Sequence, residues 1–310
     1  MKTEATAFAP ASVSNVACGF DIMGFALEGA GDRVTVRRTS GGGIRITIIT
    51  GCEGTLPKDV ASNTAGPPVQ EVARRCGYKH GLEIEVHKAL PIGSGIGSSA
   101  ASAVAAAVAT NAVLDAGLSR TELLECAIEG EKVASAAIHA DNLAPSLWGG
   151  FTLVRGIHPV DVVPIVCPRP LWCALILPSI LIETKESRKL LPCTVALADV
   201  IVQTGNAAGL VAGLMSGDFG LIGRSLHDRI AEPARMHMIP RYLATKEAAL
   251  SSGALGCNIS GSGPAVFALC ASAEIAHRVA GSMGEAFRPT GIRHTTLVSC
   301  INTSGARVLA

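Results

Sequence analysis

The chain has 310 residues and a formal net charge of +1, and no run of basic residues stands out. This balance argues against broad electrostatic attraction to nucleic acid, so we expect no nucleic-acid partner. Charged residues make up only 16% of the chain and aromatic residues 4%, so the core has to be built from Ala, Val, Ile and Leu. The N-terminus has no apolar stretch typical of a signal peptide, and the apolar stretch 171–182 is too short to span a membrane. We therefore expect a cytoplasmic protein that does not bind a membrane.

The ten cysteines are scattered along the chain, and none of them has CxxC spacing. Most lie in apolar stretches, which is typical of reduced and buried side chains. A zinc site or a disulfide framework therefore fits the sequence poorly.

Hydrophobic patterning predicts the elements of the first half. The stretch 82–87 alternates strictly between apolar and polar residues, which is typical of a half-exposed antiparallel strand. Small residues over 100–117 predict a buried helix. Ser119 and Glu122 fit a capping box that opens the next helix, expected to run to about residue 137. Further strands are expected at 3–12, 32–38 and 44–50, with the last two joined as a hairpin by the turn at 40–43.

The second half mixes strands and helices in the same way. This mixture favours an α+β fold over a regular βαβ array. A proline-rich segment at 167–170 marks the predicted boundary between a domain of residues 1–166 and a domain of residues 167–310. We expect strands at 151–155, 162–166, 172–177, 265–271 and 295–301, helices at 195–216, 240–252 and 273–287, and a second glycine-rich turn at 257–264.

The most informative segment is the glycine-rich loop between the strand 82–87 and the helix that follows. Gly93, Gly95 and Gly97 alternate with small or apolar residues and lead into a pair of serines. Glycine lets backbone N–H groups approach a ligand, and a helix N-terminus adds free N–H groups and a positive dipole end. That combination binds phosphate, so we predict a nucleotide triphosphate site. The predicted nucleotide-binding residues are Pro91, Ile92, Gly93, Ser94, Gly95, Ile96, Gly97, Ser98, Ser99, Ala100 and Ala101.

Other interpretations of this loop fit less well. No lysine follows the glycines, as a P-loop requires. Gly95, Gly97 and Ala100 satisfy a permissive dinucleotide fingerprint. However, the strand before them is not apolar throughout, and Asp115 falls near the end of the helix instead of after a second strand. A tight turn without a ligand explains some of the glycines, but not Pro91, the three glycines and the serine pair together.

The segment 91–101 resembles the phosphate loop of the galactokinase, homoserine kinase, mevalonate kinase and phosphomevalonate kinase (GHMP) superfamily. Two further segments support this resemblance: 9–15 with 19–21 near the N-terminus, and 260–264 near the C-terminus. Three motifs in the right order are far more specific than one. The resemblance implies a two-domain α+β fold, with an N-terminal part like ribosomal protein S5 domain 2 that binds nucleotide. It also implies a ferredoxin-like C-terminal part that completes the substrate pocket.

Other segments are similar to those of the homoserine kinase family. The segment 139–142 is similar to its H-x-D-N element, 184–188 to its T-x-x-x-R element, and 228–235 to its D-x-x-x-E-P-x-R element. The match runs over essentially the whole chain, from about Ala5 to Ile301. It implies ATP-dependent phosphorylation of the hydroxyl of L-homoserine, a step in threonine biosynthesis, by a homodimer that uses Mg²⁺.

The resemblance also gives single residues a role in substrate binding. Homoserine is a small zwitterion, whose carboxylate suits the guanidinium groups of Arg188 and Arg235. Its ammonium suits the carboxylate of Asp21. The other residues expected in the amino-acid pocket are Asn15, His139, Asn142 and Gly261.

Asn142 stands where mevalonate kinase-like relatives are thought to carry an aspartate as general base. An amide cannot accept a proton as a base at neutral pH. We therefore expect Asn142 to orient the substrate hydroxyl, while the proton passes late, to the γ-phosphate itself, in a loose transition state. Thr184 and Arg235 are expected to assist by holding the hydroxyl or stabilising charge.

Ser99 and Glu131 are the expected ligands of Mg²⁺, and Glu129 is the nearest rival of Glu131. The adenine contacts are poorly marked, because the segment 62–64 matches the family only weakly. Two alternatives to homoserine phosphorylation stay open from the sequence: a kinase of another small alcohol in the same superfamily, and a nucleotide-binding protein without catalysis.

Overall fold

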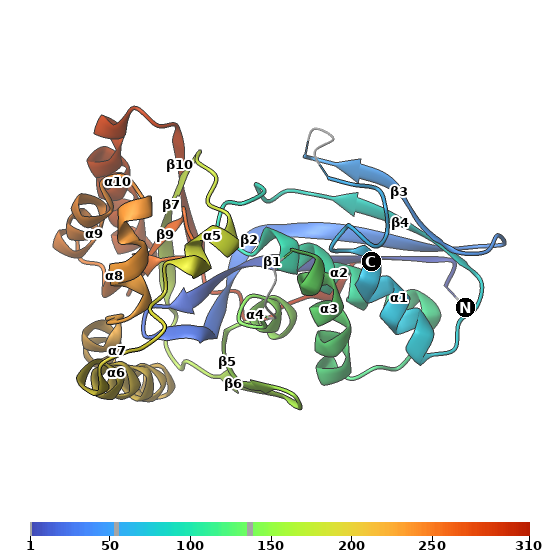
Figure 1. Cartoon of the computed structure of the whole chain (residues 1–310), viewed down its shortest axis with the longest axis horizontal. Helices are drawn as coiled ribbons and strands as arrows, with labels where there is room; N and C mark the ends of the chain where they lie inside the picture. The colour runs from blue at the N-terminus through green and yellow to red at the C-terminus, as the bar shows by residue number, and fades with distance from the viewer. Residues whose placement is uncertain (1, 53–55, 135–138) are drawn as a thin grey trace.

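The computed structural model describes residues 2–52, 56–134 and 139–310. Within these residues the chain forms a seven-stranded sheet and a four-stranded sheet, with helices packed against both (Figure 1). The larger sheet has the order β11-β1-β2-β4-β3, and β5 and β6 extend it beside β2. Its strands are β1 (Glu4–Val16), β2 (Gly19–Thr39), β3 (Ile44–Thr50), β4 (Gly81–His87), β5 (Phe151–Ile157), β6 (Val160–Ile165) and β11 (Arg307–Val308).

The hairpin expected between 32–38 and 44–50 is wrong. β4 lies between these strands, antiparallel to β2 and parallel to β3. In the β2–β4 register Val34 faces Val86 and Val36 faces Ile84, so the apolar side chains of both strands share one buried face. β3 buries only Ile46, which suits it to the edge of the sheet. The chain returns from β3 to β4 through α1 (Gly66–Arg75).

Two helices from the predicted helical stretches, and a short third helix that was not expected, cover one face of this sheet (Figure 1). α2 (Ser98–Leu114) consists almost entirely of small buried residues, so its backbone approaches β1 and β2 closely. α3 (Arg120–Ala134) opens with the predicted capping box, in which Ser119 N donates to Glu122 Oε2 at 2.8 Å and Glu122 N donates to Ser119 Oγ at 3.3 Å. The expected end of this helix near 137 lies outside the described residues. α4 (Leu143–Trp148) follows.

The smaller sheet has the order β10-β7-β9-β8 with every pairing antiparallel, as in a ferredoxin-like fold. The helix expected at 273–287 is confirmed with those bounds, whereas the glycine-rich turn expected from 257 begins only after Ile259, because 256–259 is a strand. The elements are β7 (Trp172–Pro178), β8 (Gly256–Ile259), β9 (Val266–Cys270), β10 (His294–Cys300), α9 (Tyr242–Ser251) and α10 (Ala273–Phe287).

The two sheets share one core. The ring of Phe25 on β2 lies 5.0 Å from that of Phe151 on β5 and 5.7 Å from that of Phe267 on β9. The chain passes from one sheet to the other between β6 and β7, and β11 returns to pair with β1. The domain boundary expected after residue 166 stays a prediction.

Several more helices link β7 to β8. They are α5 (Thr184–Lys189), α6 (Leu197–Ser216), α7 (Phe219–Ser225), α8 (Ala231–Arg235) and the 3-10 helix Met236–Met238; a second 3-10 turn, Arg288–Thr290, precedes β10. Among the described residues α6 alone is long and apolar enough to cross a membrane, with a mean hydropathy of 1.3. Most of the apolar stretch 171–182, which was expected to be too short to span a membrane, forms β7. Only 17% of the apolar window of α6 is buried, so this helix presents apolar side chains to solvent.

Candidate active site

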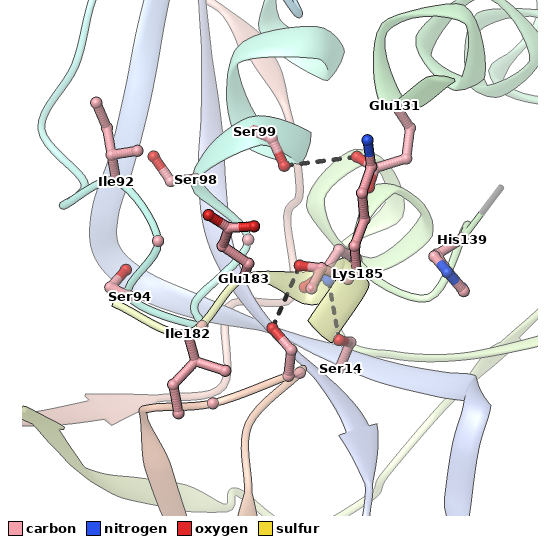
Figure 2. A pocket seen from close by; sticks show the side chains of 18 of the residues that line it. Ser14, Ile92, Ser94, Ser98, Ser99, Glu131, His139, Ile182, Glu183 and Lys185 are labelled. Carbon is pink, nitrogen blue, oxygen red and sulfur yellow. Dashed lines mark hydrogen bonds between the residues drawn. The ribbon is translucent and has the colours of Figure 1, made fainter. Parts of the chain in front are cut away.

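A pocket of about 500 Å³ lies where the glycine loop after β4, the β1–β2 turn, α5 and the loop after β8 converge (Figure 2). It gathers residues from widely separated parts of the sequence. The predicted site residues that line it are Asn15, Asp21, Ile92, Gly93, Ser94, Gly95, Gly97, Ser98, Ser99, Glu131, His139, Asn142, Thr184, Arg188, Arg235 and Gly261.

The two glycine-rich loops meet at this pocket. Ser260 Oγ donates to the carbonyl oxygen of Gly95 at 2.6 Å. A Cβ on Gly95 would lie 2.8 Å from the carbonyl oxygen of Gly263, and one on Gly97 would lie 2.2 Å from Ser12 Oγ. Both glycines also have positive φ, so no other residue fits either position without strain. This close approach leaves the loop and the first turn of α2 facing the pocket, as an anion site requires.

Four residues of the predicted nucleotide-binding set do not line the pocket: Pro91, Ile96, Ala100 and Ala101. Ile96 is 1% exposed, and the two alanines are wholly buried in the core. The side chains of these three residues therefore pack the loop and the helix against the sheet and do not face a ligand, whereas Pro91 is exposed outside the pocket. Ser98 Oγ is also turned inward and donates to the carbonyl oxygen of Leu90 at 3.2 Å.

Ser99 and Glu131 face each other across the pocket wall (Figure 2), with Ser99 Oγ 3.5 Å from Glu131 Oε2. Glu129 does not line the pocket and pairs with Lys132 at 2.6 Å. No three His, Cys, Asp or Glu side chains in 2–52, 56–134 and 139–310 are grouped to hold a metal by themselves. A hydroxyl and one carboxylate beside an anion site fit Mg²⁺, which prefers oxygen ligands and shares them with phosphate.

The amino-acid side of the pocket is built around Asp21. Arg188 Nη2 donates to Asp21 Oδ2 at 2.6 Å, and His139 Nδ1 lies 3.3 Å from Oδ1. The backbone N–H of Asp21 donates to Asn15 Oδ1 at 2.8 Å, and Asn15 Nδ2 donates to the carbonyl oxygen of Gly261 at 2.8 Å. Asn15 and Asp21 both have positive φ, a conformation that Asn and Asp tolerate better than most residues. Five predicted residues thus form one connected cluster.

The charge of Asp21 and those of its two basic neighbours stabilise each other. Burial raises the pKa of Asp21, but the hydrogen bonds and positive charges of His139 and Arg188 outweigh it and lower the pKa to about 2. Burial lowers the pKa of His139, but the hydrogen bond and charge of Asp21 outweigh it and raise the pKa above 6.5. Asp21 is therefore ionised at neutral pH, and His139 holds its proton to a higher pH than a free imidazole.

Asn142 is fixed by two serines of β1. Ser12 Oγ donates to Asn142 Oδ1 at 2.9 Å, and Asn142 Nδ2 donates to Ser14 Oγ at 2.9 Å. Across the pocket, Thr184 Oγ1 lies 3.3 Å from Ser262 Oγ. The two serines define the orientation of the amide and were not found from the sequence.

Arg235 is 4% exposed and lies over the ring of Phe20, with its guanidinium carbon 4.9 Å from the ring centroid. Its Nε donates to the carbonyl oxygen of Ser187 at 3.2 Å, and its Nη1 donates to that of Gly261 at 3.4 Å. None of the ion pairs within the described residues includes Arg235. Its charge therefore faces the pocket without a carboxylate partner.

The two acidic residues of the predicted D-x-x-x-E-P-x-R element support Arg235 without lining the pocket. The Asp228 carboxylate accepts N–H groups at the start of α8, at 2.8 Å from Ile230 and 3.0 Å from Ala231. Glu232 accepts from Tyr242 Oη at 2.8 Å and Asn258 Nδ2 at 2.7 Å, which ties α8 to α9 and β8.

Besides the two serines of β1, three further residues at or next to the pocket were not predicted from the sequence: Asp141, Lys88 and Asp32. Asp141 lines the pocket and is 2% exposed, and its Oδ2 accepts the N–H of Asn15 at 3.3 Å. Its place in the H-x-D-N element was the available signal. Lys88 also lines the pocket and is paired with buried Asp32. These two lie 56 residues apart, and no local pattern links them. Beyond the loop the pocket extends to Leu56, Ser62, Thr64 and Val133, a region for which no adenine contact could be assigned from the sequence.

Comparisons with known proteins agree with this geometry. The family model of the GHMP kinase N-terminal domain matches residues 63–150, and that of the GHMP kinase C-terminal domain matches residues 210–289. A curated homoserine kinase from Chloroherpeton thalassium is 43% identical over 99% of both chains. The crystal structure of homoserine kinase from Cytophaga hutchinsonii is 46% identical, with a TM-score of 0.96 over 100% of this chain and 98% of that one.

More distant structures share the fold alone. The crystal structure of L. major mevalonate kinase in complex with R-mevalonate has a TM-score of 0.74 at 15% identity, over 98% of both chains. The two sheets and the paired glycine loops are those of a GHMP kinase, a phosphotransferase that uses ATP. Within that superfamily the chain belongs to the homoserine kinase family.

Proposed function

We propose that this chain transfers the γ-phosphoryl group of ATP to the side-chain hydroxyl of L-homoserine, a step of threonine biosynthesis. One observation carries the proposal: an anion-binding loop and a cluster of opposite charges suited to an amino acid line the same pocket. The similarity to homoserine kinases along nearly the whole chain supports the choice of acceptor.

The acceptor is held by its two charges. Arg235 offers a guanidinium without a carboxylate partner, so the substrate carboxylate binds there and reaches Arg188 as well. Asp21 then turns from Arg188 to the substrate ammonium. Because a zwitterion brings one positive and one negative charge, it replaces the ion pair of Asp21 and Arg188 with a pair between Asp21 and the ammonium and a carboxylate shared by Arg188 and Arg235. Asn15, His139 and Gly261 form the rest of this subsite.

The donor lies along the glycine loop. Backbone N–H groups of the loop and of the first turn of α2 bind the β- and γ-phosphates. Ser99 and Glu131 hold Mg²⁺, which neutralises charge on the phosphate oxygens when bound. The nucleoside binds at the far end of the pocket, which is lined by Ser62, Thr64 and the apolar Leu56 and Val133.

The substrate hydroxyl is oriented between Asn142 and Thr184. The amide of Asn142 keeps its bonds to Ser12 and Ser14 and has one acceptor and one donor site left for the hydroxyl. Asn142 does not take the proton, so the proton leaves late, to a γ-phosphate oxygen. Thr184 helps to hold the hydroxyl, and the positive charge of Arg235 helps to stabilise the charge that develops during transfer.

The active species is a cytoplasmic homodimer that pairs through α6. This helix exposes Leu197, Ile201 and Met215 by 74%, 64% and 63%. Beside them runs an apolar groove lined by small residues of α6 together with Ile22 and Leu153. An exposed apolar patch of this kind is typical of an interface. The single ionisable residue of α6, Asp199, is paired with Arg229, so two copies of the face meet without repulsion between like charges.

The test is steady-state ADP release from Mg-ATP with L-homoserine, L-serine, L-threonine, mevalonate or no acceptor. We expect turnover that depends strongly on L-homoserine. Turnover with another alcohol would assign a different acceptor, and binding of ATP without turnover on any acceptor would reject the catalytic role.

A further inference from the structure

A buried lysine lies beneath the phosphate loop with all of its hydrogen-bonding capacity in use. Lys88 Nζ donates to the carbonyl oxygen of Ser98 at 2.8 Å, to Ser102 Oγ at 2.9 Å and to the carboxylate of Asp32. The side chains of Lys88 and Asp32 are 3% and 0% exposed. An ammonium has three hydrogens, so this lysine has none left for a phosphate oxygen.

Asp32 completes the connection between the two ends of the loop. Its Oδ1 accepts the N–H groups of Ala89 at 2.9 Å and Leu90 at 3.2 Å, immediately before the loop. Its Oδ2 accepts Ser102 Oγ–H at 2.9 Å, in the second turn of α2. One carboxylate on β2 therefore fixes the residues that enter the loop and, together with Lys88, the helix that leaves it.

Stability alone does not account for this pair. Two buried charges lose their hydration, and well-packed apolar residues of similar volume often stabilise a protein as well or better. A cation at the N-terminal end of a helix also opposes the helix dipole. What apolar residues cannot supply is a fixed set of directed bonds that join β2, the segment 88–90 and the first two turns of α2.

We propose that Lys88, acting through Asp32, is a positioning residue for the triphosphate: the pair holds the start of the glycine loop and the N-terminus of α2 at the spacing at which their N–H groups converge on phosphate. This inference rests on the proposed function, because it concerns the nucleotide half of that site. It assigns the lysine no direct bond to the nucleotide. The position differs from that of a P-loop lysine, which follows its glycines and contacts phosphate.

The test compares Lys88→Met with Lys246→Met, which breaks the partly buried ion pair between Lys246 and Glu232 outside the phosphate loop. Calorimetry measures the Kd for Mg-AMP-PNP, a nonhydrolysable ATP analogue, and kinetics give the KM for L-homoserine. For Lys88→Met we expect binding of the analogue to weaken roughly tenfold or more, with the KM for L-homoserine changed less than about twofold. For Lys246→Met we expect a lower Tm and an unchanged Kd for the analogue.

A charge-free variant separates positioning from stability. In Lys88→Met/Asp32→Leu the core regains apolar packing, so the Tm recovers, but binding of the analogue stays weak if the pair positions the loop. Recovery of both the Tm and the Kd would overturn the inference, and so would a single variant that lowers the Tm while its Kd stays within about twofold. If Lys88→Met does not fold, Ser102→Ala removes one of the three bonds and should weaken binding about threefold.

Failure of the proposed function has a different signature. A wild-type protein that binds Mg-AMP-PNP but does not phosphorylate L-homoserine would reject the acceptor, and the comparison of Kd values would still decide the role of Lys88. A wild-type protein that does not bind the analogue would overturn both proposals.

Discussion

Arg188 Nη2 lies 2.6 Å from Asp21 Oδ2, and the two side chains keep 39% and 29% of their surface exposed. The pair therefore lies at the pocket wall in contact with solvent, where an ion pair is worth little and exchanges readily. A zwitterionic ligand carries the same two charges in one molecule. Without a ligand, Asp21 and Arg188 thus pair with each other, and a zwitterionic ligand replaces this pair by binding both side chains.

The first prediction concerns the ammonium. Asp21→Asn keeps the shape of the side chain and its hydrogen bond to Arg188, but it removes the negative charge. We expect the KM for L-homoserine to rise roughly 10- to 100-fold, the range for loss of a charge-assisted hydrogen bond, while the Kd for Mg-AMP-PNP stays unchanged. Asp161→Asn, which removes the exposed pair with Arg155, is the matched control and should leave both constants as they are. An unchanged KM in Asp21→Asn would place the ammonium elsewhere.

Asn142→Ala tests how the hydroxyl is oriented. The variant removes the amide and leaves Ser12 and Ser14 in place, so nucleotide binding should persist. We expect kcat to fall on the order of 100-fold, because an acceptor out of line by about 1 Å loses that much rate. Single-turnover kinetics with saturating Mg-ATP measure the effect. Turnover near that of the wild type would rule out the orienting role.

Glu131→Gln and Glu129→Gln form a matched pair for the metal. Glu131 faces Ser99 in the pocket, whereas Glu129 is held by Lys132 outside it. A carboxylate binds Mg²⁺ far better than an amide does. For Glu131→Gln we expect the Mg²⁺ concentration at half-maximal activity to rise roughly tenfold, and for Glu129→Gln no change. An equal response of the two variants would contradict the assignment of Glu131.

The elements of the fold that depend on local pattern could be predicted from the sequence. The capping box of Ser119 and Glu122 lies within one turn, and β4 alternates along a single strand, so each carries its own signal. The hairpin failed because a turn such as 40–43 does not determine which strand pairs with β2. That choice depends on the match of Val34 and Val36 to β4, which lies beyond an intervening helix.

In the candidate site, too, residues in local motifs could be predicted from the sequence, whereas residues brought together only by the fold could not. Glycine-rich loops and short motifs bring their residue types together in sequence, and most of the residues they indicated line the pocket. Lys88 and Asp32 carry no such signal, because a buried ion pair is defined only when two distant strands and a helix are packed. The motif also did not show which of its side chains face the pocket. Ala100 and Ala101 belong to the phosphate motif but are buried in the core.

The fourth prediction concerns the homodimer. Ile201→Glu places a charge on the exposed apolar face of α6, where pairing of two copies would bury it beside its symmetry mate. We expect light scattering after gel filtration to change from the mass of a dimer to that of a monomer. Leu243→Glu is the control, since Leu243 is 62% exposed on α9, away from this face. A wild-type monomer, or an Ile201→Glu dimer, would show that α6 does not form the interface.

The last prediction follows from the carboxyl of Asp141. Burial raises its pKa to about 6, with a further contribution from Asp21, while His139 and the N–H of Asn15 act in the opposite direction. The pKa of this acid is higher in the folded chain than its usual 3.8, so the unfolded chain releases the proton more readily. Ionisation of Asp141 therefore lowers the free energy of unfolding. That penalty is absent below pH 3.8, grows as the pH rises towards 6, and is complete above it.

Asp141→Asn keeps an acceptor for Asn15 and cannot ionise. The Tm of the variant minus that of the wild type should therefore be more positive at pH 7.5 than at pH 5, by on the order of 2 °C. Thermal unfolding without substrate, in buffers of equal ionic strength, measures this difference, and an equal or smaller difference at pH 7.5 would mean that the carboxyl ionises in the folded protein without penalty.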